Sequence, residues 1–351
     1  IRSRATDVFN ARNGTSRHVI ATLFSRTIPN NSLQKCDETR PHQTTQMETS
    51  PPASMLQIQL FHHFSTEVMS SFNNHSQEST ALSDIFIQKG LSTPYLMNEI
   101  LALAALHLGL VHPSQKEYYH YHATQLQTHA ISLFNSTIGD IDEEACIPAF
   151  LFSSILGSHV LCKTLRFREE DELSAFLTKF VQYASVHRGV RTVAGRSWRT
   201  LNQPSLKSLV QRSSLAANPQ RCEIRSGLLQ RIKAAKLGSI VTEHYTQTVE
   251  LLRFETESPG EGIQNVNCTA VIAWTVQVPA EYFDHLALGR PEALVILAHW
   301  AVMLNYHRDF WVFGDGGDFL IRSITEYLGP EWETWLAWPK GCLQRDSVEA
   351  I

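Results

Sequence analysis

Apolar residues recur every three or four positions along most of the chain after residue 50, which is the spacing of one helix face. This pattern predicts helices over 55–72, 95–110, 114–134, 143–165, 169–187, 228–254, 265–286, 291–306 and 317–328. The segment 95–110 is apolar on nearly every side, as expected for a helix that is buried all round. No segment shows several alternating strands joined by hairpin turns. The sequence therefore predicts an all-α fold, a single orthogonal bundle of about ten helices.

Prolines predict several of the helix ends. Ser50 followed by two prolines offers a cap and a first helical turn, and His112-Pro113 closes the helix before it. Pro148 either kinks its helix or marks the first turn. Residues 196–227 are polar and contain two prolines, so we expect a loop-rich region with one short helix near 206–210.

Three regions differ in composition. Residues 1–50 are rich in Arg, Ser, Thr, Asn and Gln and lack sustained periodicity, so we expect a disordered leader, with a mitochondrial targeting segment as the alternative. Residues 51–340 are predicted to form the helical domain, and residues 341–351 a tail.

The overall composition excludes several functional classes. Hydrophobic residues make up 43% of the chain and charged residues 18%, which is enough apolar material for a large core. A formal net charge of −4 argues against non-specific binding of nucleic acid. The chain contains no uninterrupted apolar run of about 18 residues, so we predict no membrane span.

No motif predicts catalysis or a metal site. The six cysteines are scattered, and the 16 histidines include no H-E-x-x-H pattern. The sequence Gly157-Ser158-His159 lacks the strand and the second glycine of a nucleophile elbow. The glycine-rich stretch at 314–318 lacks the lysine of a phosphate-binding loop, and a turn between helices explains it better. We therefore predict no catalytic residue, no metal and no cofactor.

Aromatic residues are concentrated near the C-terminus. Core packing explains them, and some of them could also line an apolar ligand cavity. The hypothesis places this cavity between helices 95–110 and 291–306, and it lets the ligand alter the packing of the aromatic segment. Polar anchors could come from His299, Asn305, His307 and Asp309. The proposed lining residues are Leu101, Leu108, Phe152, Trp274, Leu297, Trp300, Met303 and Phe310.

Five segments in order resemble the regulatory region of fungal binuclear-zinc-cluster transcription factors of the sterol-uptake-control type. They are LFHHFSTE at 60–67, PYLMNEILALAALHL at 94–108, FVQYASVHRGVR at 180–191, RPEALVILAHWAV at 290–302 and WETWLAWP at 332–339. Each segment alone is generic helix, whereas the shared order and spacing are more specific. Together they cover about residues 55–340.

This resemblance implies a helical regulatory domain that senses a lipophilic, sterol-like molecule, forms homodimers and acts in the nucleus. The family binds DNA through a C-x2-C-x6-C cluster that holds two zinc ions. Here Cys36 stands alone, so no zinc ligand can be assigned, and DNA would be contacted only through a cluster not present in this sequence. Two alternatives stay open: an interaction protein that does not bind DNA, and a small-molecule enzyme such as a cyclase or pericyclase, which needs no recognisable motif.

Overall fold

The helices of this chain form one all-α assembly in the computed structural model. The structure describes residues 54–72, 78–137, 145–168, 172–196, 223–252 and 268–349. These ranges contain no strand, which confirms the predicted fold class. They contain 13 helices when the continuous run of α2, η1 and α3 is counted once, a few more than expected.

The first group of helices packs around α5. It comprises α2 (Met55–His63), a π-helical turn η1 (Phe64–Val68), α3 (Met69–Phe72), α4 (Glu78–Ser92), α5 (Pro94–Val111), a short 3-10 turn η2 (Pro113–Gln115) and α6 (Lys116–Thr137). Helix α5 packs most extensively against α6 and also contacts α2, α4 and α7. Twelve of its residues are buried, as its uniformly apolar sequence predicted.

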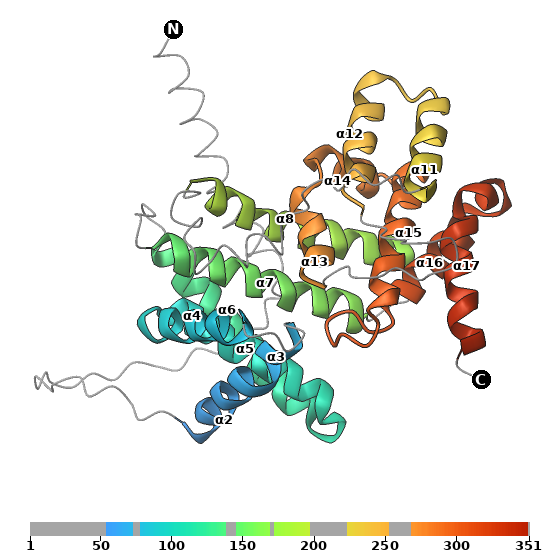
Figure 1. The fold of residues 1–351 in the computed structure, drawn as a ribbon. Coiled ribbons are helices and arrows are strands. Elements are labelled where there is room, and N and C mark those ends of the chain that lie inside the picture. Colours follow the sequence, from blue (N-terminus) through green and yellow to red (C-terminus); the bar gives the residue numbers. More distant parts are fainter. Residues whose placement is uncertain are drawn as a thin grey trace, which may run out of the picture.

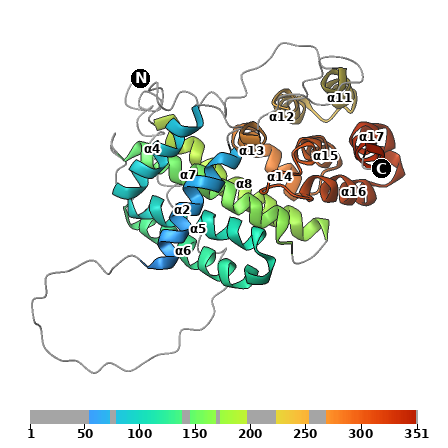
Figure 2. The ribbon, with the colours of Figure 1, turned by 60° about the horizontal axis from the view of Figure 1, so that its bottom comes forward.

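Two long helices, α7 (Cys146–Arg166) and α8 (Leu173–Arg196), pack against each other and form the middle of the molecule. Figures 1 and 2 show them between the α2–α6 group and the helices of the C-terminal half. Helix α7 contacts α5 on one side, and α8 contacts α13, α14 and α16 on the other.

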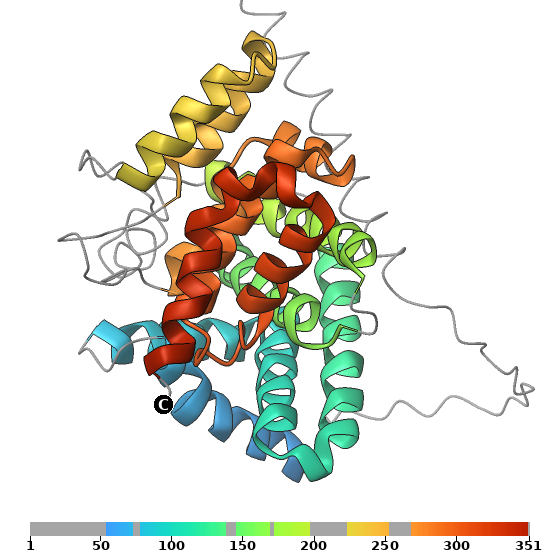
Figure 3. The same cartoon turned by 90° about the vertical axis from the view of Figure 1, so that its right-hand side faces the viewer.

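The C-terminal half is built on α15. It comprises α11 (Glu223–Ala234), α12 (Ser239–Glu250), α13 (Cys268–Gln277), α14 (Ala280–Ala287), α15 (Pro291–Tyr306), α16 (Gly316–Leu328), the short turn η3 (Pro330–Trp332) and α17 (Glu333–Glu349). Helices α11 and α12 pack against each other, and Figures 1 and 3 show this pair at the periphery. The buried apolar side chains form one continuous cluster that reaches from Leu60 in α2 to Leu336 in α17.

Caps and prolines explain several helix boundaries. Ser54 begins α2 with a capping box, because its hydroxyl accepts from the Gln57 amide while the Gln57 side chain accepts from the Ser54 amide. Pro94 occupies the first turn of α5, and α5 ends just before His112-Pro113 as predicted. Pro148 is the third residue of α7, so it marks the first turn.

Several helix boundaries differ from the sequence predictions. The expected helix 228–254 is divided into α11 and α12, and α8 continues past residue 187 to Arg196. The expected helix 265–286 is divided into α13 and α14, because Pro279 lies between them and lacks an amide donor. Helix α4 was not predicted, although it buries Leu82 and Phe86. Helix α17 continues to residue 349, across the expected start of the tail at 341. The leader, the cap at Ser50 and the short helix near 206–210 lie outside the described residues.

The glycine-rich stretch at 314–318 connects α15 to α16, which confirms the predicted turn. Gly314 has a φ of +50°, a conformation that glycine adopts without strain. A Cβ at Gly317 would lie 2.4 Å from the Asn305 amide nitrogen, so the backbones of α15 and α16 approach closely here. This close crossing fixes the position of the loop between the two helices.

Candidate functional site

The loop at 307–315 joins the two halves of the molecule. Trp311 in this loop donates a hydrogen bond from its indole nitrogen to Ser71 Oγ in α3, at 2.9 Å. Its ring centroid lies 4.8 Å from that of His107 in α5. Phe72 packs edge-on against Phe310 at 5.2 Å and against Trp311 at 6.1 Å. We call Phe72, His107, Phe310 and Trp311 the Trp311 joint, because they connect α3 and α5 to the segment after α15.

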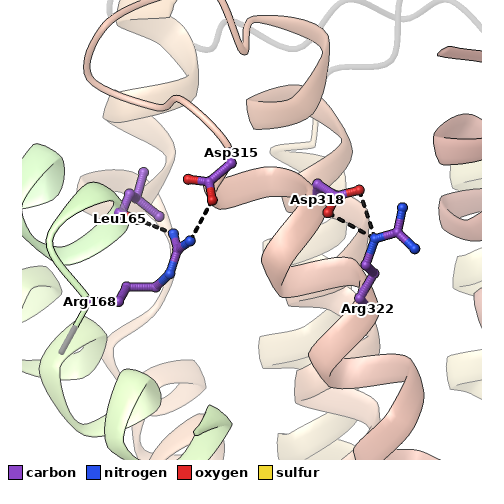
Figure 4. A network of polar contacts seen from close by, with 5 residues as sticks. All are labelled: Leu165, Arg168, Asp315, Asp318 and Arg322. Atoms are coloured by element: carbon purple, nitrogen blue, oxygen red, sulfur yellow. Dashed lines mark hydrogen bonds and ion pairs between the residues drawn. The ribbon is translucent and has the colours of Figure 1, made fainter. Parts of the chain in front are cut away.

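The C-terminal end of α7 holds the same loop from another side. Arg166 donates a hydrogen bond to the Trp311 carbonyl oxygen at 3.0 Å. Arg168, just after α7, pairs with Asp315 at 2.6 Å and also donates to the Leu165 carbonyl (Figure 4). The Arg168 guanidinium lies 4.3 Å from the centre of the Phe319 ring in α16. The loop is therefore fixed to α7 by both charge and backbone contacts.

A pair of histidines adjoins the Trp311 joint. His63 Nε2 and His107 Nδ1 lie 2.7 Å apart, and the two rings are stacked with centroids 5.0 Å apart. A hydrogen bond between two imidazoles requires that at least one nitrogen is unprotonated. Burial lowers the pKa of His107 to about 4 and also lowers the pKa of His63. The pair is thus built to be neutral near pH 7.

In the C-terminal half, the tryptophans form a closed stack. The rings of Trp274 and Trp300 are parallel within 20°, with centroids 5.3 Å apart, and Phe180 packs on Trp300. The Trp300 indole nitrogen donates to the Val271 carbonyl at 3.1 Å, and that of Trp274 to the Thr248 carbonyl at 3.4 Å. Both side chains are fully buried with their donors satisfied, as expected for core aromatics.

The eight predicted lining residues are all buried, and they belong to four helices and the loop after α15. Leu101 and Leu108 lie in α5 and Phe152 in α7, whereas Trp274 lies in α13 and Leu297, Trp300 and Met303 lie in α15. Phe310 belongs to the Trp311 joint. The main partners of α5 are α6 and α7, and those of α15 are α16 and α17. Helices α5 and α15 are thus not main packing partners of each other, and the hypothesis of a cavity between helices 95–110 and 291–306 stays a prediction.

The four proposed anchors also serve different neighbours. His299 Nδ1 lies 2.8 Å from the Val295 carbonyl of its own helix, and its ring stacks on Trp338 at 5.4 Å. Asn305 is buried, and His307 is half-buried against Tyr306. Asp309 is exposed. The four residues differ widely in exposure, and their role as anchors for a ligand stays a prediction.

The sequence analysis missed a buried hydrogen-bonded pair in the middle of the molecule. Glu99 in α5 and His159 in α7 are both fully buried, and Glu99 Oε1 lies 2.9 Å from His159 Nδ1. One signal was available, because Glu99 is the only charged residue in the apolar sequence of α5. A lone carboxylate in such a helix is expected to have a partner.

A second buried polar network links α8 to α13. The Tyr183 hydroxyl, His187 Nδ1 and Thr275 Oγ1 lie 3.0–3.1 Å from one another. Burial lowers the pKa of His187 to about 3, so the ring is neutral in the folded protein. Within the described residues, no three His, Cys, Asp or Glu side chains are placed to hold a metal ion.

Helices α5 and α7 are long and apolar enough to cross a membrane by length and composition, and the bent pair α14–α15 passes the same test as one unit. About two thirds of the apolar window in α5 and 72% of that in α7 are buried against other helices. Their packing in the interior accounts for their apolar sequences.

The described helices α2 to α8, which carry the Glu99–His159 pair and the His63–His107 pair, coincide with a known domain. Residues 59–186 match the fungal specific transcription factor domain. Over 317 aligned residues the chain is also 23% identical to a Zn(2)-C6 fungal-type transcription factor of Gibberella zeae. That alignment covers 81% of this chain and 61% of the relative. The resemblance to zinc-cluster transcription factors is thus supported at the level of this domain.

Proposed function

We propose that this chain is the ligand-responsive regulatory region of a fungal zinc-cluster-type transcription factor. The observation that carries the proposal is the match of residues 59–186 to the fungal specific transcription factor domain. The similarity to the Gibberella zeae factor supports it and extends beyond the matched domain. The continuous helical core over both halves agrees with a regulatory region that acts as one unit.

A fusion experiment tests the regulatory role. The chain is fused to a heterologous DNA-binding domain in yeast, and a reporter gene with the matching DNA sites is measured. We expect reporter activity to differ from that of the DNA-binding domain alone. The control is Leu103→Asp, which places a charge in the fully buried face of α5 and should remove the effect by unfolding the region. Equal activity for the fusion, the control and the DNA-binding domain alone would contradict the proposal.

A lipophilic ligand is the finer part of the proposal. The resemblance to the sterol-uptake-control type and the aromatic interior support it, because apolar pockets are lined mostly by such side chains. Titration with sterols and terpenoids should change the tryptophan fluorescence in a saturable way, since Trp274 and Trp300 lie in the shared core. In this proposal the chain is not an enzyme, so the bound molecule should be recovered chemically unchanged.

The proposal also includes homodimers and action in the nucleus. A fluorescent fusion should accumulate in the nucleus, and light scattering should give about twice the chain mass of 39.7 kDa. A monomeric mass, or a fusion excluded from the nucleus, would favour the alternative of an interaction protein that does not act on DNA.

A further inference from the structure

Four buried side-chain atoms in the layer formed by α5, α6 and α7 have no hydrogen-bond partner in the protein. They are Glu99 Oε2, His120 Nε2, Gln127 Nε2 and His159 Nε2. A buried polar atom without a partner costs about 1–3 kcal/mol, and native proteins contain few of them. Two of the four, Glu99 Oε2 and His159 Nε2, belong to one hydrogen-bonded pair, and this pair points to a partner that the protein does not itself supply.

The Glu99–His159 pair leaves two acceptors open. Because His159 Nδ1 faces the carboxylate, this nitrogen carries the hydrogen and donates it to Glu99 Oε1. In neutral His159 the other ring nitrogen, Nε2, is therefore an acceptor, as is Glu99 Oε2. Both side chains have no exposed surface. The open acceptors are thus directed into the protein interior and out of reach of bulk solvent.

Donors lie in the same layer. Lys163 is one helical turn after His159 in α7, where burial lowers its pKa and the nearby Glu99 carboxylate raises it. On α6, Gln127 contributes its amide nitrogen two turns after His120. The pKa of His120 is lowered first by burial and then by the charges of Lys163 and Lys116. Open acceptors and donors therefore come from all three helices.

An aromatic triad adjoins this polar group. Tyr95, Phe134 and Phe152 come from α5, α6 and α7, and their ring centroids lie 4.4–5.3 Å apart. Tyr95 is one turn before Glu99, so the two side chains share a face of α5. The same three helices thus place an apolar aromatic group beside open polar atoms, the two kinds of contact that an amphipathic molecule requires.

We propose that Glu99 and His159 anchor the hydroxyl group of a neutral, otherwise apolar molecule, whose body packs toward Tyr95, Phe134 and Phe152. The hydroxyl donates its hydrogen to Glu99 Oε2 and can accept one from a donor of α6 or α7. A carboxylate or phosphate would be repelled by Glu99, and a cation by Lys163. A hydrocarbon would leave the carboxylate oxygen unsatisfied. This inference rests on the lipophilic ligand of the proposed function and names its polar end.

The test compares alcohols with their methyl ethers. The full chain is titrated with farnesol and ergosterol, each beside its methyl ether, by equilibrium dialysis. The ether keeps the apolar body but cannot donate a hydrogen bond. We expect the alcohol to bind about tenfold more tightly, because one satisfied hydrogen bond of this kind contributes about 1.4 kcal/mol.

Variants test whether Glu99 causes the preference for the alcohol over its methyl ether. Glu99→Leu should remove the preference for the alcohol. Glu99→Met, which keeps the chain length but has no oxygen acceptor, serves the same purpose if circular dichroism shows that the leucine variant does not fold. Phe152→Ala should weaken the binding of alcohol and ether alike. Thr275→Val, in the separate Tyr183–His187–Thr275 network, is the matched control and should keep the preference.

The outcomes separate this inference from the proposed function. If alcohol and ether bind equally to the natural chain, or if the Glu99 variants keep the preference, the anchor is wrong while the lipophilic ligand stands. If none of the four probes binds, both are overturned, and water is then the partner of the open acceptors. Preference for the alcohol that is lost in the Glu99 variants and kept in Thr275→Val supports the anchor.

Discussion

The Trp274–Trp300 stack of the C-terminal half and the layer of α5, α6 and α7 bury their polar atoms in different ways. In the C-terminal half, the indole nitrogens of Trp274 and Trp300 and the hydroxyl of Tyr282 all donate to backbone carbonyls. In the layer of α5, α6 and α7, by contrast, Glu99 and His159 use one atom each for their mutual contact and leave the other open. The Trp274–Trp300 stack is therefore a satisfied core, whereas the layer of α5, α6 and α7 contains buried polar atoms without partners. A second group of such atoms, from His244, Tyr245 and His285, lies on α12 and α14. In this protein the high density of aromatic residues near the C-terminus reflects core packing. The candidate binding site is indicated instead by isolated polar residues in apolar helices, such as Glu99.

The largest effect on the free energy of unfolding is expected in the Trp274–Trp300 stack. Trp300→Ala removes a fully buried ring that stacks on Trp274 and donates to the Val271 carbonyl, so the variant should lose about 4 kcal/mol of unfolding free energy. Urea denaturation followed by circular dichroism measures this loss. Tyr306→Ala at the end of the same helix is the control, because Tyr306 is 47% exposed and should cost far less. Similar losses in the two variants would show that the stack is not the core of this half.

In the polar layer, removing one partner should cost more than removing both. His159→Leu leaves the Glu99 carboxylate buried without its donor, so we expect a loss of about 3 kcal/mol in unfolding free energy. The double variant with Glu99→Leu removes the charge as well and should return to within about 1 kcal/mol of the natural chain. The same urea denaturation decides the question. A double variant at least as unstable as His159→Leu alone would mean that the pair itself stabilises the fold, in conflict with a pair retained for binding.

The sequence alone was sufficient for the fold class and insufficient for the candidate site. Periodicity and proline positions predicted the ends of α5 and the first turn of α7, because these depend on local backbone chemistry. Helix α4 was missed because its sequence is polar and its stability comes from packing of Leu82 and Phe86. Which helices would meet could not be read from periodicity, since each apolar face is compatible with several partners.

The predicted site residues illustrate the same limit. Leu101, Phe152 and Trp300 were rightly expected to be buried, but the sequence did not say which helices would pack against α5 and α15. Glu99 stood in a segment that was noted only for its apolar character. Its partner His159 lies 60 positions away, so the pair becomes visible only when α5 and α7 are side by side.

Acid should act first on the histidine pair at the Trp311 joint. The folded pKa of His107 is lowered to about 4 while the unfolded value stays near 6.5, so between these values the unfolded chain binds the proton more readily. Stability is therefore retained above pH 6.5 and falls as the pH drops toward 4, by about 2 kcal/mol for this group. Glu67 opposes the lowered pKa of its neighbour His63, and His62 and His112 reinforce it.

The variant His107→Phe tests this assignment, because it keeps a ring beside Trp311 and removes the titrating group. Urea denaturation between pH 7 and pH 4 should show a shallower loss than in the natural chain. The loss will not vanish, since His187 and His299 are also held neutral by burial and contribute over the same range. His129→Gln, at an exposed position of α6, is the control. An unchanged slope in His107→Phe would exclude the histidine pair as a source of acid sensitivity.

The smallest effect compares two ion pairs that lie close together in Figure 4. Arg168 and Asp315 join α7 to the loop after α15, and the Arg168 side chain is only 13% exposed. Asp318 and Arg322 lie within α16 and are 39% and 65% exposed. Double-mutant cycles with alanine should give a coupling of about 1 kcal/mol for the first pair and about 0.3 kcal/mol for the second. The difference arises because the partly buried guanidinium is less screened by solvent and its pairing also positions the loop that carries Trp311. Equal couplings would mean that the Arg168–Asp315 pair holds the loop no more strongly than an exposed pair within one helix.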